Sequence, residues 1–236
     1  MTNSYNLSRK INKIVFFHGL NNNTDCFTPI REHFQKLGFK TEMIVLPCHG
    51  EIREEASDWN EAIKVFEKKM ETLENEPYYA IAFSHGAVYL NLWMETHSQG
   101  RPVKQVLLAP ALYIRKQKFI EKLLPLLPPK LLIPSLAPRE LRRYHILSAR
   151  EYNILVQKIV EWQRIRDSFR VPTMVLVDPK DELVDAKALK KHLGAELWER
   201  PYLKKGLGSH HILFHPDYFT NDDWKRLTSR IETFFR

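Results

Sequence analysis

Short apolar runs alternate with longer amphipathic segments along this chain of 236 residues. The first run, at 14–17, consists of branched and aromatic side chains, and comparable runs recur at 42–46, 78–83, 103–109, 173–177 and 196–202. Their length and composition are typical of strands that are buried on both faces. Strands of this kind that alternate with helices predict a parallel sheet with helices on both sides. The expected fold class is therefore α/β, with one sheet of six strands.

Helices are predicted where apolar residues recur three and four positions apart, at 27–37, 59–73, 87–97 and 224–234. Gly38 is placed to end the first of them, since glycine readily adopts the left-handed conformation that closes many helices. Asp58 and Glu61 form a capping box ahead of the second. Each predicted helix follows a predicted strand, which strengthens the prediction of a parallel sheet.

The connection between the fourth and fifth predicted strands is far longer than an ordinary loop, at about 60 residues. Its later half carries a capping box, Ser148 and Glu151, ahead of an apolar face that includes Leu155 and Ile159, so it is expected to be helical. We therefore predict a core made of residues 1–110 and 171–236, and an inserted, largely helical cap at 111–170.

Positive charge is concentrated in the same segment. The chain has a net charge of +8, and residues 115–170 contain 13 Lys and Arg against 5 Asp and Glu, which accounts for the whole excess. A basic chain can indicate a nucleic-acid binder, but these residues are interleaved with leucine and proline and no nucleic-acid-binding motif is present. We therefore predict no nucleic-acid partner.

The sequence also bears on the cellular compartment of the protein. Residues 1–12 are polar and do not resemble a secretory signal, and the most apolar segment, 123–138, is interrupted by five prolines. Neither Cys26 nor Cys48 has the spacing of a metal site or of a disulfide scaffold. The expectation is a cytoplasmic protein with reduced thiols and no transmembrane helix.

A candidate nucleophile lies between the third predicted strand and its helix. Ala82-Phe83-Ser84-His85-Gly86 has small residues two before and two after a serine, the pattern of a nucleophile elbow. In an elbow, a sharp strand-to-helix turn exposes the serine hydroxyl at the edge of the sheet. The alternative is a serine that only caps the helix. The context of strand, turn and helix favours Ser84 as a nucleophile.

A serine nucleophile needs a base and an orienting acid, which in such folds follow it in the order acid, then histidine. Asp181 follows the fifth strand and is the predicted acid. Asp178 is closer to the strand end and is expected to cap a turn, and Asp185 is expected to cap the next helix. Glu182 is a weaker alternative.

The predicted base comes from the loop at 206–213, which follows the sixth strand. It contains two adjacent histidines, His210 and His211, and neighbouring residues of an extended loop point in opposite directions, so one of them can face Ser84. We favour His211, because His210 stands where a small residue is usual.

Two backbone N–H groups are predicted to stabilise the oxyanion, those of Leu20 and His85. Leu20 lies in the turn after the first strand, and His85 directly follows the nucleophile. His18 has no second ligand at a suitable spacing, so it is expected to order its loop rather than bind a metal. No metal and no cofactor is predicted.

These residues together resemble the α/β-hydrolase family, in particular its small esterase and monoacylglycerol-lipase-like branch with an inserted cap. His18-Gly19 is similar to the family's oxyanion loop, residues 46–50 to its proline-glycine-histidine-glycine turn, and Ser84, Asp181 and His211 to its triad. The chain departs from the pattern at Ala82, where glycine is usual, and at His210. The resemblance implies a minimal six-stranded sheet, since the N-terminus is too short for the family's first two strands.

The predicted function is hydrolysis of carboxylic esters, of the esterase, monoacylglycerol lipase or lysophospholipase type, through an acyl-enzyme. The substrate would be a small-molecule or lipid ester. A thioesterase of the same mechanism is a close alternative, and a catalytically silent module that binds lipid or membrane surfaces is a second.

The cap carries a further prediction. Leucines at 123–132 and arginines at 139–150 give it apolar surface beside positive charge, which indicates contact with an anionic membrane surface. The alternative is that the leucines pack the cap onto the sheet and the arginines form a solvated face.

Overall fold

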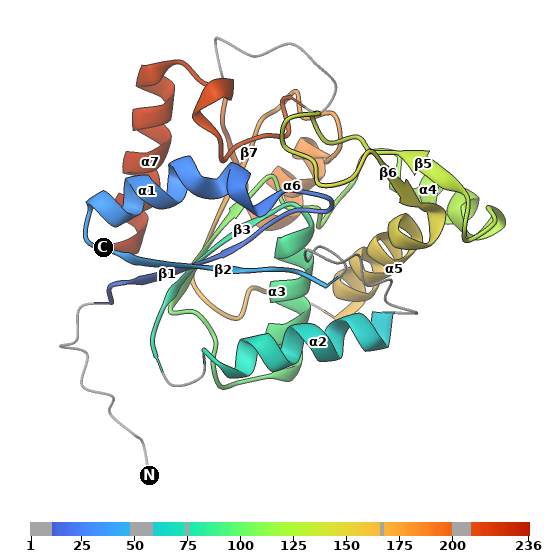
Figure 1. Cartoon of the computed structure of the whole chain (residues 1–236), viewed down its shortest axis with the longest axis horizontal. Coiled ribbons are helices and arrows are strands. Elements are labelled where there is room, and N and C mark those ends of the chain that lie inside the picture. Colours follow the sequence, from blue (N-terminus) through green and yellow to red (C-terminus); the bar gives the residue numbers. More distant parts are fainter. Residues whose placement is uncertain (1–10, 48–58, 74–75, 166–167, 200–208) are drawn as a thin grey trace.

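Six strands form the central sheet, in the order β2-β1-β3-β4-β7-β8, and every adjacent pair is parallel. The computed structural model of the chain describes residues 11–47, 59–73, 76–165, 168–199 and 209–236 (Figure 1). The strands are β1 (Lys13–Phe17), β2 (Lys40–Ile44), β3 (Tyr79–Phe83), β4 (Lys104–Leu108), β7 (Thr173–Val177) and β8 (Glu196–Leu197). The predicted α/β class and the six-stranded parallel sheet are confirmed.

The inner strands are more deeply buried than the outer ones. In β1, β3, β4 and β7 every residue after the first is buried, as expected of strands covered on both faces. The expectation is wrong for β2, which is only partly buried and begins at Lys40, because it lies at an edge of the sheet. At the other edge β8 has two residues rather than the predicted seven, and residues 200–202 lie outside the described part.

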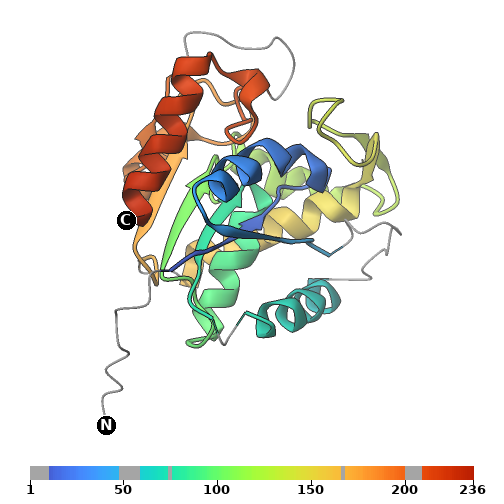
Figure 2. The same cartoon turned by 60° about the vertical axis from the view of Figure 1, so that its left-hand side comes forward.

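Helices cover both faces of the sheet (Figures 1 and 2). α1 (Thr28–Lys36) and α7 (Asn221–Phe235) lie side by side, with His33 bonded to Glu232. α3 (His85–Thr96) lies on the opposite face between α2 (Trp59–Glu71) and α5 (Ala149–Ile165), and α6 (Ala186–Leu193) connects β7 to β8. The connections from β1 to β2 and from β3 to β4 run in opposite directions, so right-handed crossovers place α1 and α3 on opposite faces.

Two predicted helix signals act as expected. α1 ends at Lys36, and Gly38 follows with a φ of 88°. The Ser148 N–H donates to Glu151 Oε2 at 2.6 Å, and the Glu151 N–H donates back to Ser148 Oγ at 3.4 Å, which is the reciprocal pattern of a capping box. Of the other predicted box, Asp58 lies outside the described residues.

Between β4 and β7 the chain leaves the sheet. This inserted segment, 111–170, contains α4 (Gln117–Leu123), the 3-10 turn η2 (Leu124–Leu126), an antiparallel pair of β5 (Leu132–Pro134) and β6 (Ile146–Ser148), and α5. The helix expected in the later half is α5, and the β5–β6 pair was not expected. α5 packs against α3, and its Ile159 and Trp162 belong to the main core, whereas α4 buries no residue. Among the described residues, no helix is long and apolar enough to cross a membrane.

Candidate active site

Ser84 lies in the tight turn between β3 and α3, with a φ of 48° and a ψ of −113°. Positive φ is uncommon for a residue with a side chain and is costly to hold. The turn is close to β1, because a Cβ added to Gly86 would lie 2.6 Å from the carbonyl oxygens of both Phe17 and His18. Glycine at this position therefore lets α3 begin directly against the end of β1. Ala82 is fully buried in the strand, where its methyl group fits.

The structure brings Ser84, His211 and Asp181 into one hydrogen-bonded chain. His211 Nε2 lies 2.9 Å from Ser84 Oγ, and His211 Nδ1 lies 2.8 Å from Asp181 Oδ2. Asp181 is fully buried, and its other carboxylate oxygen accepts hydrogen bonds from the N–H groups of Leu183 (2.8 Å) and Val184 (2.9 Å). The carboxylate thus has a fixed orientation toward the imidazole, which in turn faces the hydroxyl.

The charge of Asp181 is stabilised in place. Burial by itself would raise the pKa of the Asp181 carboxyl, but the adjacent His211 and the N–H donors of Val184 and Leu183 outweigh it and lower that pKa. The acid therefore stays ionised well below neutral pH. An ionised carboxylate beside a histidine stabilises the imidazolium that forms when the histidine takes up a proton.

The alternative residues from the sequence have other partners. His210 Nδ1 lies 3.2 Å from Asp178 Oδ2, and the His210 N–H donates to Glu182 Oε1 at 3.3 Å. Asp178 also accepts from the Lys180 N–H at 2.8 Å, as a turn cap does, and Asp185 caps α6 through the Ala188 N–H. His210 and Asp178 thus form a second histidine–aspartate pair, which the sequence analysis did not predict.

The loop after β1 lies beside the serine. His18 accepts from the Leu46 N–H at 2.9 Å through Nε2, and its Nδ1 lies 2.8 Å from the Gly19 carbonyl oxygen, so the side chain orders its loop. A Cβ on Gly19 would lie 2.8 Å from the ring of Phe83, the residue before the nucleophile. Leu20 lines the same cavity as Ser84, and His85 is the first residue of α3. Of the two residues with predicted oxyanion amides, one therefore lines the cavity at Ser84 and the other directly follows the serine in the chain.

A cavity of about 560 Å³ opens onto Ser84 and His211. The core contributes Leu20, Phe83 and Ile212, and the inserted segment contributes mainly apolar side chains, among them Ile120, Leu124, Ile133, Leu136, Leu147, Leu155 and Val156. Arg115, Lys116 and Glu182 are the charged residues of the lining. An apolar chamber beside a hydroxyl, an imidazole and a carboxylate is suited to a ligand with a long apolar portion.

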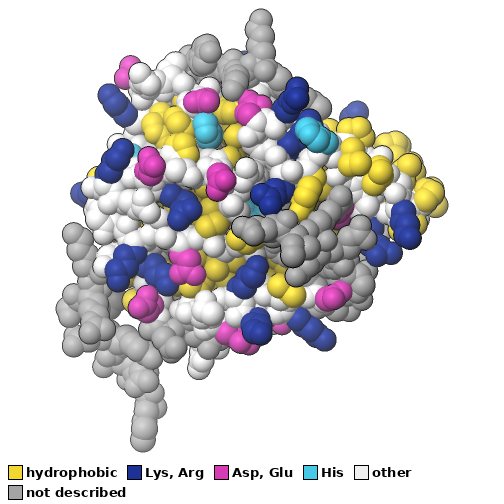
Figure 3. Space-filling view, viewed as in Figure 1, with side chains coloured by type: hydrophobic (Ala, Val, Ile, Leu, Met, Phe, Trp, Pro, Cys, Tyr) yellow, Lys and Arg dark blue, Asp and Glu magenta, His cyan; other side chains and the backbone are white. Residues whose placement is uncertain are grey.

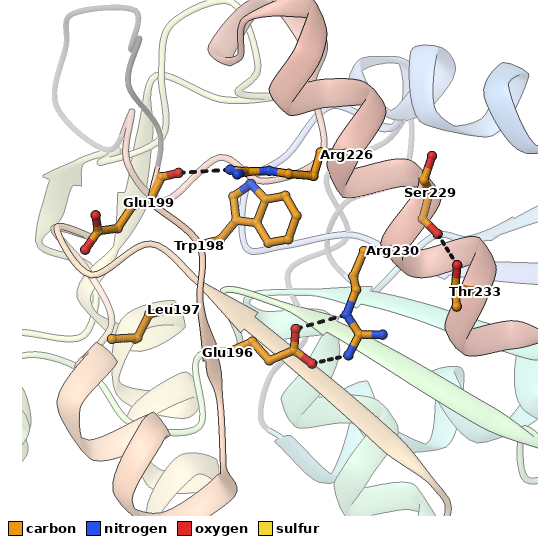
Figure 4. A pocket seen from close by; sticks show the side chains of 8 residues that line it. All are labelled: Glu196, Leu197, Trp198, Glu199, Arg226, Ser229, Arg230 and Thr233. Carbon is orange, nitrogen blue, oxygen red and sulfur yellow. Dashed lines mark hydrogen bonds and ion pairs between the residues drawn. The ribbon is translucent and has the colours of Figure 1, made fainter.

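A second cavity, of about 640 Å³, lies between β8 and α7 (Figure 4). Its two arginines are held by neighbouring groups: Arg230 pairs with Glu196, and Arg226 bonds the Glu199 carbonyl oxygen and lies 4.7 Å from the Trp198 ring centre. None of its lining residues belongs to the Ser84 site. Its groups therefore serve mainly to hold α7 against the edge of the sheet.

Cys26 plays no part in the Ser84 site. Cys26 is free and buried, and its Sγ donates to the Asn23 carbonyl oxygen at 2.6 Å. Burial raises the pKa of this thiol to about 12, so it is not a nucleophile at neutral pH. Cys48, most of the turn at 46–50, and residues 206–208 of the histidine loop lie outside the described residues.

No protein-family model matches the chain, and no curated protein matches it in sequence. Solved structures match the chain in their fold. The soluble variant of monoglyceride lipase from Saccharomyces cerevisiae, in complex with a substrate analogue, has a TM-score of 0.72 at 12% identity, over 95% of this chain and 86% of that one. A monoacylglycerol lipase from Paleococcus ferrophilus has a TM-score of 0.69 at 16% identity, over 94% and 93%.

A mouse protein, alpha/beta hydrolase domain-containing protein 10, has a TM-score of 0.62 at 14% identity, over 95% of this chain and 89% of that one. At identities this low, the similarity shows a shared fold and nothing about activity. Together with the strand order, they show that the chain has the α/β-hydrolase fold, as the sequence resemblance implied.

Proposed function

We propose that this protein is a serine hydrolase of carboxylic esters, with Ser84, His211 and Asp181 as its catalytic residues. The observation that carries the proposal is the unbroken hydrogen-bonded chain from the Ser84 hydroxyl to the buried Asp181 carboxylate, at the floor of an apolar cavity. Solved lipases and esterases share the fold, which supports ester hydrolysis over other chemistry.

The reaction proceeds in two halves. Ser84 Oγ attacks the ester carbonyl carbon as its proton passes to His211 Nε2, and the ester C–O bond then breaks as that proton passes to the leaving alcohol. Water repeats the sequence on the acyl-enzyme and releases the acid. The backbone N–H groups of Leu20 and His85 stabilise the oxyanion in both halves, and Asp181 orients the imidazole.

The cavity favours an ester with a substantial acyl chain. Its walls are mostly aliphatic, and its volume of about 560 Å³ is in the range of small-molecule sites. A lipid ester such as a monoacylglycerol or a lysophospholipid, or a small-molecule ester, fits these properties. The thioester of the same acid would react by the same steps. We also propose a cytoplasmic site of action, a compartment in which free thiols such as that of Cys26 stay reduced.

A fluorophosphonate probe tests the proposal directly. A serine hydrolase should be labelled at Ser84, located by peptide mass spectrometry, and should hydrolyse esters in a panel from acetyl to palmitoyl that includes lysophospholipids and thioesters. Chain-length preference would identify the acyl class. A catalytically silent lipid-binding module, the second candidate, would bind the lipids while Ser84 stays unlabelled.

We further propose that the inserted segment acts as a cap that binds anionic lipid surfaces. Several of its large apolar side chains face solvent: Leu126 is 80% exposed, Phe119 63% and Leu132 56%. Figure 3 shows hydrophobic side chains gathered at its right-hand edge, on the side where α4, β5 and β6 lie, with basic side chains beside them. Side chains as exposed as these three do not pack onto the sheet, which disfavours a purely structural role for them.

The position of this apolar surface relative to the cavity supports the same partner. α4 and β5 each carry exposed apolar residues and also contribute Ile120 and Ile133 to the cavity wall. The inserted segment also carries exposed cations: Lys116, Lys118, Lys122, Lys130, Arg139, Arg143 and Arg150. Apolar side chains that can enter a bilayer, together with cations that pair with anionic headgroups, would bring the cavity to a lipid substrate.

Binding to lipid vesicles should depend on the charge of the lipids. We expect the protein to bind anionic vesicles more tightly than neutral ones and to release as salt rises, since each basic residue near the surface contributes about 1 kcal/mol and is screened by salt. The double variant Phe119→Ser, Leu126→Ser should bind more weakly. Leu37→Ser, which removes a 43% exposed apolar side chain from the end of α1, is the matched control. Equal binding to both vesicle types would contradict the proposal.

A further inference from the structure

The loop that follows β1 is bonded to the inserted segment through Asn21. The Asn21 side chain donates from Nδ2 to Ser135 Oγ (2.7 Å) and to the Tyr144 carbonyl oxygen (2.6 Å), and its Oδ1 accepts from the Tyr144 N–H (2.8 Å). Its backbone carbonyl accepts from the Arg143 N–H at 2.8 Å. One asparagine thus makes four hydrogen bonds to three residues that lie more than 110 positions further along the chain.

The next two residues of the loop continue this connection. Asn22 pairs with Arg142 as an isolated antiparallel bridge, and the Asn23 N–H donates to the Leu141 carbonyl oxygen at 2.8 Å. Figure 2 shows the segment around 135–145 (olive) beside the blue segment ahead of α1. The loop and the inserted segment are therefore joined as a continuous strip of structure rather than at a single point.

Asn21 is held in an unusual conformation to make these bonds. It is 1% exposed, and its φ is 59°, in the left-handed region. Asparagine tolerates that region better than most residues, and a strained backbone persists where the surroundings determine it strongly. The four hydrogen bonds hold the Asn21 backbone in this conformation.

The position of Asn21 connects the two parts of the site. It directly follows Leu20, and the Asn22 N–H closes the turn by donating to the Gly19 carbonyl oxygen at 3.3 Å. On the other side of the connection, Ser135 and the adjacent Leu136 line the cavity that contains Ser84. The wall of the cavity and the backbone that carries the Leu20 amide therefore share one set of hydrogen bonds.

We infer that Asn21 is a positioning residue, which uses the inserted segment to hold the Leu20 amide in its place toward the oxyanion. The inference rests on the proposed function. It makes Ser135, Arg143 and Tyr144 a support of the oxyanion site, so that these residues cannot move away from the core while the enzyme is active. A displacement of the amide by a fraction of an ångström would weaken transition-state stabilisation while leaving acyl-chain binding intact.

The decisive variant is Asn21→Gly, which keeps the left-handed backbone accessible and removes all three side-chain hydrogen bonds. We expect kcat to fall about 100-fold with little change in KM. The affinity for an alkyl trifluoromethyl ketone, which forms a tetrahedral adduct with Ser84 and places an oxyanion in the site, should fall by a similar factor. The affinity for the fatty acid of the same chain length should be unchanged.

The control is Tyr218→Phe. It removes the 2.9 Å hydrogen bond from the Tyr218 hydroxyl to Glu140, which also joins the inserted segment to the core but does not involve the Gly19–Asn22 turn. Its kcat and its affinity for the ketone should stay near those of the wild type. Ser135→Ala, which removes a single acceptor of Asn21, should show a smaller loss of the same kind as Asn21→Gly.

Other results would overturn the inference. If Asn21→Gly matches Tyr218→Phe, or raises KM without lowering kcat and ketone affinity, Asn21 is a structural contact only. If Asn21→Gly does not fold, Asn21→Asp gives the same test, because it retains the Oδ1 acceptor for the Tyr144 N–H and loses both donors. A wild-type protein that neither hydrolyses esters nor reacts with the probe rejects the proposed function itself, and this inference with it.

Discussion

Replacement of Ser84 by alanine is expected to abolish ester hydrolysis, with kcat lowered by about 10⁶-fold. The Oγ atom removed is the one that lies 2.9 Å from His211 Nε2, and no other hydroxyl bonds to that nitrogen in the described part of the chain. Without it no acyl-enzyme can form. Hydrolysis of a chromogenic ester and fluorophosphonate labelling should both disappear.

Thermal unfolding provides the control for this variant. Alanine and serine both carry a Cβ, so the strain of the turn at a φ of 48° is unchanged, and the folded state should retain its melting temperature. A variant that remains folded and still hydrolyses esters at the wild-type rate would reject Ser84 as the nucleophile. Residual activity at the level of solvent hydrolysis is compatible with the assignment.

Asp181→Asn is expected to have the next largest effect, lowering kcat by about 10⁴-fold with little change in KM. The amide can no longer act as a negative partner of the imidazolium, and it can hold the ring in the wrong tautomer. Asp178→Asn should be mild, because Asp178 pairs with His210, which does not bond to Ser84. Substitution of the two histidines should differ in the same way: His211→Ala should lower kcat severely, and His210→Ala only mildly. A severe Asp178→Asn beside a mild Asp181→Asn would mean that the wrong carboxylate was assigned.

The difference in stability between the wild type and Asp181→Asn should depend on pH. The carboxyl pKa is lowered in the folded protein, so the ionised group stabilises the fold at pH values above the ordinary carboxyl pKa of about 4. This contribution is lost as the pH falls through the lowered pKa. The free energy of unfolding of the wild type should therefore exceed that of the variant at neutral pH, and the difference should shrink in acid. A constant difference would argue against the lowered pKa.

The regular part of the fold could be predicted because its signals are local. The strand predicted at 173–177 has the same first and last residues as β7, since a short, mostly apolar run between polar segments has few other interpretations. Errors arose at the two edges of the sheet. There β2 starts at Lys40, with polar residues among its first three, and hydrogen bonding to β1 rather than hydrophobicity decides its extent.

The contacts between distant segments could be predicted only where a rule of order applies. Serine, acid and histidine come in a known sequence at the carboxyl ends of strands, so the three residues now found in contact could be named in advance. No comparable rule relates Asn21 to Tyr144, or His210 to Asp178. The asparagine run at 21–23 was a usable signal, because asparagine tolerates the left-handed region, but nothing local identifies its partners.

The conformation of Ser84 has a consequence for attempts to engineer this protein. Holding a residue with a side chain at positive φ costs on the order of 1–3 kcal/mol, and glycine would avoid most of that cost. A library screened only for thermal tolerance would therefore favour Ser84→Gly, which removes the proposed nucleophile. Directed evolution toward heat resistance has to keep a selection for turnover in every round, because one of the positions where glycine relieves backbone strain is that serine.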